Sequence, residues 1–196
     1  MKQIVIIHGG NSYSSQDAYL ADLKMRQISY EHLKFQKKWK QWIFEQMPET
    51  DVLLPSMPNS DNAVYDEWKI YFEKFLPFLS DDVRLVGHSL GAMFLSIYLN
   101  ENPLPRPVRQ LVLIAGGYDD DTYGDYGGFM VKSAKNVAKY AEEIHLFHSE
   151  DDAVVSFSEL AKYQNDLPTA TVHAFTNRGH FIEATFPELL EILKQK

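Results

Sequence analysis

A serine lies between two glycines at the end of an apolar run, in the sequence Gly87-His88-Ser89-Leu90-Gly91. The run Val83–Val86 precedes it, and apolar residues at helical spacing follow it as far as Asn100. A G-x-S-x-G nucleophile elbow requires this strand–turn–helix context, because residues flanking so tight a turn must be small. The turn would hold the Ser89 hydroxyl clear of the backbone, near the positive end of a helix. The pattern therefore predicts Ser89 as a nucleophile; the alternative is a tight turn with an incidental serine.

A serine hydroxyl is a weak nucleophile, and it needs a base that a third group orients. Where such an elbow is used, an acid and then a histidine follow along the chain, each on a loop beyond a later strand. His180, in Asn177-Arg178-Gly179-His180-Phe181, is the one histidine after the last predicted strand. We expect His180 to be the base; the alternative is an ordinary histidine of a surface loop.

The acid should come from the loop that follows the predicted strand Ile144–Phe147. The adjacent acidic residues of this loop are Glu150, Asp151 and Asp152. Spacing favours Asp152, which lies three residues after Ser149 and three before Val155, as in many loops of this kind. Its carboxylate would fix the tautomer of His180 and stabilise the imidazolium. Asp151 and Glu150 remain the alternatives.

The oxyanion of a tetrahedral intermediate needs hydrogen-bond donors. The backbone N–H of Leu90, directly after the serine, is one expected donor. The loop His8-Gly9-Gly10-Asn11 follows the first apolar run and should supply the second, with Gly10 preferred over Asn11. Side chains beside these loops are expected to bind substrate, and they are Asn11, His88, Tyr118 and Phe181.

Short apolar runs alternate with longer stretches of helical period, and this alternation must position the residues above. The predicted strands are Ile4–His8, Asp51–Leu54, Val83–Val86, Val108–Ala115, Ile144–Phe147 and Thr171–Phe175. Their Val, Ile and Leu content is typical of strands buried on both faces. The clearest helical patterns run from Val64 to Pro77, from Leu90 to Asn100 and from Phe186 to Leu193. We predict an α/β fold of three layers, with a six-stranded, mainly parallel sheet and helices on both faces.

Composition limits the classes of function. A length of 196 residues suits a single domain spanning 1–196, and the absence of cysteine excludes thiol chemistry. A formal net charge of −8 argues against binding to nucleic acid or to an anionic membrane. The first apolar run has four residues, fewer than the roughly 7–15 of a secretory signal, so we expect a cytoplasmic protein. No cofactor or metal is expected, and the oligomeric state is left open.

These residues, in this order, resemble the α/β-hydrolase superfamily, and within it the small serine hydrolases of the retinoblastoma-binding protein nine type. The matching segments are His8-Gly9, Trp39-Lys40-Gln41-Trp42-Ile43, Met57-Pro58-Asn59, Asp66-Glu67-Trp68, the elbow, Asp152 and Gly179-His180-Phe181. The resemblance implies an α/β-hydrolase fold without a separate cap domain and an activity similar to that of small carboxylesterases. We therefore expect a serine hydrolase that cleaves small esters through an acyl-enzyme, with thioesters as a second option. The alternatives are a catalytically silent binding protein and an amidase or acyltransferase that uses the same residues.

Two features lie between the first strand and the second. Compared with the family, about 20 extra residues precede Trp39, and they predict a helical insertion near Ser14–Lys34 that could overhang the site. Its apolar residues either line an acyl pocket or belong to a packed surface helix; they are Tyr13, Tyr19, Leu20 and Met25. At the end of the insertion, between Lys34 and Trp42, lysines alternate with aromatic residues. This pattern predicts an amphipathic helix whose lysines, including Lys40, reach water.

Overall fold

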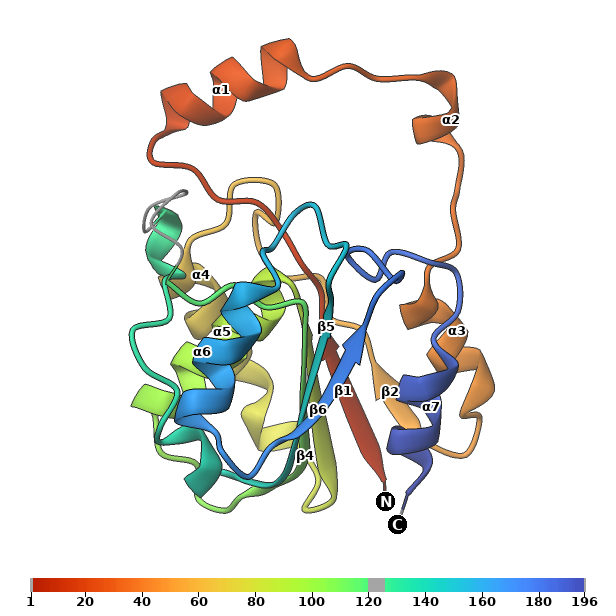
Figure 1. Cartoon of the computed structure of the whole chain (residues 1–196), viewed down its shortest axis with the longest axis vertical. Helices are drawn as coiled ribbons and strands as arrows, with labels where there is room; N and C mark the ends of the chain where they lie inside the picture. Colours follow the sequence, from red (N-terminus) through yellow and green to blue (C-terminus); the bar gives the residue numbers. More distant parts are fainter. Residues whose placement is uncertain (1, 120–125, 196) are drawn as a thin grey trace.

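The computed structural model describes residues 2–119 and 126–195, which form one sheet with helices on both faces (Figure 1). The strands are β1 (Gln3–Ile7), β2 (Asp51–Leu53), β3 (Val83–His88), β4 (Val108–Ile114), β5 (Ala141–Ser149) and β6 (Thr171–Phe175). They lie in the order β2-β1-β3-β4-β5-β6, and every neighbouring pair is parallel. The predicted six-stranded parallel sheet is confirmed.

Some strands extend beyond their predicted bounds where polar residues take part in pairing. β5 begins at Ala141, three residues before the predicted start, and its second and third residues are Glu142 and Glu143. Glu142 accepts a hydrogen bond from Arg109 at 2.6 Å, and Glu143 accepts one from Gln110 at 2.8 Å, so neighbouring strands are joined by polar pairs here. A prediction that takes strands from runs of apolar residues misses a strand that begins with charged residues.

Helices cover the sheet in two groups, which makes three layers. On one face lie α3 (Trp39–Gln46) and α7 (Pro187–Lys194); on the other lie α4 (Tyr65–Phe75), α5 (Leu90–Glu101) and α6 (Ser158–Asp166), as Figure 1 shows. Short 3₁₀ turns occur at Leu76–Phe78, Tyr126–Gly128 and Val137–Lys139.

Side chains alternate along β1, the strand next to the edge strand β2, and they contribute to a separate apolar core on each face. Val5 and Ile7 pack in the core under α4 and α5, whereas Ile4 and Ile6 pack in the core under α3 and α7. These four side chains are at most 1% exposed. Strands buried on both faces explain the continuous apolar runs in the sequence.

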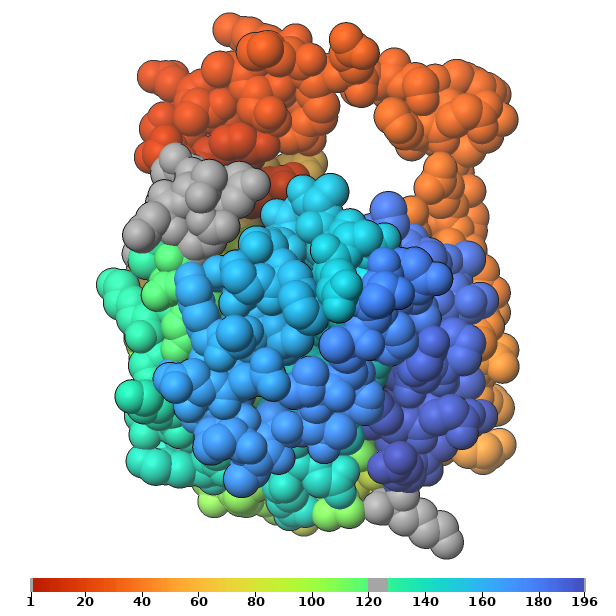
Figure 2. Space-filling model, viewed as in Figure 1, coloured from red at the N-terminus to blue at the C-terminus, as the bar shows by residue number. Residues whose placement is uncertain are grey.

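The insertion after β1 forms an arch over the carboxyl end of the sheet, as Figures 1 and 2 show. It contains α1 (Gln16–Met25) and α2 (Tyr30–Leu33), and neither helix has a buried residue. Every residue from 20 to 37 is exposed, and Figure 2 shows an open gap between this arch and the body of the molecule. The predicted helical insertion is present, but it is not a surface helix packed on the sheet. No separate cap domain covers this edge in the described part of the chain.

Within the described ranges, no helix combines the length and the apolar character needed to cross a membrane. Part of the acidic stretch 119–125, which the sequence predicts to be a solvated loop rather than a cation site, lies outside the described residues.

Candidate active site

Ser89 occupies a strained turn between β3 and α5. Its backbone angles are φ 57° and ψ −123°, a positive φ that residues other than glycine rarely adopt. The N–H of Ser89 donates to the carbonyl of Ile114 at 2.8 Å, which ties the turn to β4. A Cβ at Gly87 would lie 2.5 Å from the carbonyl oxygen of Gly91, and α5 starts close against β1. The two flanking glycines therefore have a steric reason, as the sequence pattern indicates.

The tightness of this turn can be tested at Gly91. We expect Gly91→Ala to lower the free energy of unfolding by about 2–3 kcal/mol, because its methyl group would collide with backbone atoms. A Cβ there would lie 2.5 Å from the Ile7 carbonyl oxygen and 2.6 Å from that of His8. Equilibrium unfolding in urea measures the change. In the control Gly117→Ala the nearest atom is the flexible Met93 sulfur at 3.2 Å, so a smaller loss is expected. Equal stability of Gly91→Ala and the parent would contradict the close packing.

Asp152 and His180 come together from two loops at the carboxyl edge of the sheet. Oδ2 of Asp152 lies 2.8 Å from Nδ1 of His180. The other carboxylate oxygen, Oδ1, accepts the N–H groups of Val154 and Val155 at 2.8 and 3.0 Å. The Asp152 side chain is fully buried and that of His180 is 12% exposed. The pair is thus held in one orientation.

The neighbouring acids occupy other positions. Asp151 accepts the Ser149 hydroxyl at 2.5 Å and the Gly179 N–H at 2.9 Å, so it joins the acid loop to the histidine loop. Glu150 is exposed. Of the three adjacent candidates, Asp152 is therefore the one hydrogen-bonded to His180.

The pKa of Asp152 reflects opposing effects. Burial raises the pKa, but hydrogen bonds from His180, Val155 and Val154 lower it more, so that it lies below its ordinary value. Asp152 is therefore ionised at neutral pH, and an ionised partner fixes the proton of His180 on Nδ1. In a neutral imidazole held this way, Nε2 is the nitrogen without a proton.

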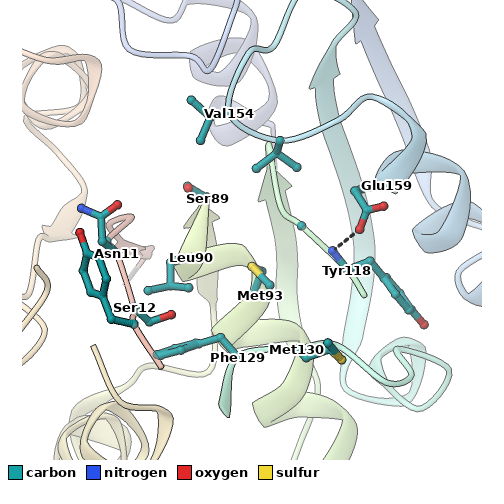
Figure 3. Close-up of a pocket in the computed structure, with 14 residues that line it drawn as sticks. Asn11, Ser12, Ser89, Leu90, Met93, Tyr118, Phe129, Met130, Val154 and Glu159 are labelled. Atoms are coloured by element: carbon teal, nitrogen blue, oxygen red, sulfur yellow. Dashed lines mark hydrogen bonds between the residues drawn. The ribbon is translucent and has the colours of Figure 1, made fainter. Parts of the chain in front are cut away.

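Ser89 lies on the wall of a mainly apolar pocket of about 360 Å³ (Figure 3). The pocket is lined by Gly10, Asn11, Ser12, Tyr13, Ser89, Leu90, Met93, Gly117, Tyr118, Phe129, Met130, Val154, Val155 and Glu159. The lining brings together the elbow, the loop after β1, the loop after β4 and the acid loop. Of the predicted substrate-binding residues, Asn11 and Tyr118 belong to this wall.

The loop after β1 approaches the serine closely. A Cβ on Gly9 would lie 3.0 Å from Cβ of Ser89 and 3.5 Å from its Oγ, so the loop backbone passes beside the serine hydroxyl. The N–H of Asn11 donates to the Ser60 carbonyl at 2.9 Å, which favours Gly10 over Asn11 as an oxyanion donor. His8 supports the loop, because its Nδ1 lies 2.6 Å from the Gly9 carbonyl while its Nε2 accepts the Met57 N–H at 2.8 Å.

The sequence profile of the family described as serine hydrolase matches residues 33–194. The chain belongs to the serine hydrolase family. The Rattus norvegicus protein named serine hydrolase RBBP9 is 26% identical over 163 residues, which are 80% of this chain and 84% of that protein. This agrees with the resemblance stated from the sequence.

Solved structures support the α/β-hydrolase fold of this serine hydrolase. The ydeN gene product of B. subtilis has a TM-score of 0.76 at 19% identity, over 98% of this chain and 97% of its own. The esterase PE8 has a TM-score of 0.61 at 18% identity, over 98% of this chain and 91% of its own. The predicted fold class is thereby confirmed.

Two predicted substrate-binding residues of the serine hydrolase lie away from the pocket. Phe181 is fully buried in the core under α3 and α7, and its backbone has a positive φ of 51°. His88 is 6% exposed, and its ring lies beneath the His180 loop, with Nε2 2.9 Å from the His180 carbonyl oxygen. Neither is retained as a substrate contact. Adjacency to a site residue in sequence does not give the direction of a side chain.

Tyr118 contributes to the pocket in a different way from that predicted. Its hydroxyl donates to Asp166 at 2.5 Å, and in Figure 3 the ring extends away from Ser89. Its backbone N–H donates to the buried Glu159 at 2.8 Å, which fixes this part of the pocket wall. Among the insertion residues, Tyr13 lines the pocket, whereas Leu20 and Met25 are 39% and 82% exposed.

Sequence reasoning missed the environment of Lys40 in this serine hydrolase. Lys40 does not reach freely into water; its Nζ lies 3.3 Å from Nδ1 of His88, and burial with the nearby charge of Lys38 lowers the pKa of Lys40 to about 8. Its neighbour Trp39 is the buried aromatic residue that the pattern predicts, 1% exposed. Nothing in the spacing of the lysines singles out Lys40, since its partner is 48 residues away. In the described residues, no group of three or more His, Asp or Glu side chains could hold a metal ion.

Proposed function

We propose that this serine hydrolase cleaves small carboxylic esters through an acyl-enzyme, with Ser89 as nucleophile, His180 as base and Asp152 as the orienting acid. The observation that carries the proposal is the Asp152–His180 hydrogen bond of 2.8 Å, on loops at the same sheet edge as the strained Ser89. Ser89 also lies on the pocket wall, where a substrate carbonyl could reach it. Nucleophile, base and orienting group are the three parts that such acyl transfer needs.

In the proposed reaction, Nε2 of His180 accepts a proton and returns it in each of the two steps. Nε2 of His180 accepts the proton as Oγ of Ser89 attacks the ester carbonyl, and the resulting oxyanion accepts the N–H groups of Leu90 and Gly10. The tetrahedral intermediate collapses, the C–O bond to the alcohol breaks, and His180 returns its proton to the leaving alkoxide. Water then attacks the acyl-enzyme with His180 again as base, and the carboxylic acid leaves as Ser89 recovers its proton.

The pocket supports a neutral, apolar acyl group of modest size. Its volume of about 360 Å³ lies toward the small end of ligand pockets, which range over roughly 300–1,000 Å³. Among the described residues of its wall, Glu159 is the one carboxylate; it lies 2.8 Å from Lys162 and accepts the Tyr118 N–H, so its charge is compensated. The acyl groups of the corresponding thioesters would contact the same pocket residues, and thioesters are the second substrate class that we propose.

A series of p-nitrophenyl esters from acetate to dodecanoate tests this function. We expect hydrolysis with kcat/KM highest for short and medium acyl groups and falling for the longest, because the pocket is small. In parallel, a fluorophosphonate should react once, at Ser89, with loss of fluoride and the serine proton as HF, and should raise the mass of the intact protein by the reagent mass less HF. A folded sample that neither hydrolyses any of these esters nor reacts with the fluorophosphonate would refute the catalytic proposal and favour a silent binding protein.

A further inference from the structure

The first two residues of α3 hold the loop that carries His180. The indole Nε1 of Trp39 donates to the Phe181 carbonyl at 2.9 Å, and the backbone N–H of Trp39 donates to the Glu183 carbonyl at 3.1 Å. Lys40 reaches the same loop through His88, which lies between Nζ of Lys40 at 3.3 Å and the His180 carbonyl oxygen at 2.9 Å. The carbonyls of His180 and Phe181 are therefore both held from α3.

The two contacts of His88 require a single tautomer. A carbonyl oxygen only accepts, so Nε2 of His88 must carry the proton that bonds to the His180 carbonyl. An ammonium group only donates, so Nδ1 of His88 must be the unprotonated nitrogen that accepts from Lys40. Each contact thus enforces the proton position that the other one needs.

We propose that Lys40 is a positioning residue, which fixes the tautomer of His88 and through it holds the backbone of His180 in place for catalysis. This inference rests on the proposed role of His180 as base. Asp152 holds the His180 ring at Nδ1, and His88 holds its carbonyl, so both ends of the residue are fixed. Lys40 itself need not touch substrate.

The loop has reason to need external support. His180 lies between Gly179 and Phe181, which have positive φ angles of 47° and 51°. A positive φ is unfavourable for an aromatic residue such as Phe181 and persists only where surrounding contacts determine it. Part of that support is the hydrogen bond from Trp39, and the chain from Lys40 through His88 fixes the carbonyl immediately before it.

Burial, assisted by neighbouring charges, keeps the His88 ring neutral. Burial lowers the pKa of His88, as do the nearby Lys40 and His180; the hydrogen bond to the His180 carbonyl and the charge of Asp152 oppose this with smaller effects, so the pKa lies well below its ordinary value. A neutral ring can accept from Lys40 while it donates to the His180 carbonyl. Removal of the Lys40 charge should therefore raise the pKa of His88.

The test compares Lys40→Met, which removes both the donor and the charge, with Lys40→Gln, which keeps a neutral donor. Lys74→Met, on the exposed end of α4, is the matched control. We expect Lys40→Met to lower kcat by about 10- to 100-fold with KM little changed, since misplacement of a catalytic group acts on the chemical step. Lys40→Gln should recover most of kcat. Circular dichroism and thermal unfolding establish that each variant is folded.

A nitrogen-15 NMR readout separates this role from a general structural one. In the parent protein, His88 should show a protonated Nε2 and an unprotonated Nδ1 throughout the neutral range; in Lys40→Met its pKa should rise. A protonated Nδ1 in the parent would overturn the proposal, as would a folded Lys40→Met enzyme with kcat within twofold of the parent, or a Lys40→Gln enzyme no better than Lys40→Met. Because the tautomer is read without turnover, failure of the parent to hydrolyse esters would refute the proposed function separately.

Discussion

Ser89→Ala should lower kcat/KM for ester hydrolysis by about 10⁴–10⁶-fold, the range found when the nucleophile of a catalytic triad is removed. Without the hydroxyl no acyl-enzyme can form, and what remains is the stabilisation given by the pocket and the backbone N–H groups. The same substitution should abolish labelling by a fluorophosphonate. Steady-state kinetics with the best p-nitrophenyl ester and intact-protein mass spectrometry measure both effects.

The loss should not come from unfolding. The hydrogen bond that ties the elbow to β4 uses the backbone N–H of residue 89, which alanine retains. We therefore expect the free energy of unfolding of Ser89→Ala to stay within about 1 kcal/mol of the parent. Ser14→Ala, at an exposed serine in the arch, is the control and should keep both activity and labelling. If Ser89→Ala still reacted with the probe, another residue would be the nucleophile.

Asp152→Asn should lower kcat by about 10⁴-fold, and the surroundings of the carboxylate explain why. Oδ1 of Asp152 is held by the N–H groups of Val154 and Val155, so the amide oxygen of asparagine would keep that position. The amide nitrogen would then face Nδ1 of His180 and donate to it. His180 would carry its own proton on Nε2, the wrong tautomer for accepting a proton from Ser89.

Asp151→Asn provides the comparison within the same loop. The Oδ1 of Asp151 accepts from Ser149 and Gly179, and an asparagine oxygen can keep both contacts, so we expect a loss of activity below about tenfold. Both variants are compared by kcat with one ester at one pH. Equal losses in the two variants, or a larger loss at Asp151, would remove Asp152 from the proposed triad.

The fold and the candidate triad can be predicted from the sequence, because they depend on the order in which strands, helices and loops follow one another along the chain. The elbow is a local pattern of small residues at a strand–helix junction, and His180 and Asp152 follow the ends of particular strands. Parallel strands bring such loops to the same edge of the sheet, so order alone predicts their proximity.

The direction of a single side chain cannot be predicted in the same way. His88 and Phe181 adjoin site residues in sequence, yet both side chains are buried, and Phe181 has a positive φ that no local pattern indicates. Lys40 resembles its lysine neighbours, and only the packing of α3 against β3 and the His180 loop distinguishes it. Contacts between residues far apart in the chain decide such cases.

The arch has a consequence for the connectivity of the molecule. Because every residue from 20 to 37 is exposed, this stretch of backbone between β1 and α3 acts as a tether that the two apolar cores do not require. β1 is paired on one side with β2 and on the other with β3, and its side chains are buried on both faces. A molecule cut once in the arch would therefore consist of two pieces that remain associated through the first strand, and changes of length in this segment would leave the sheet intact.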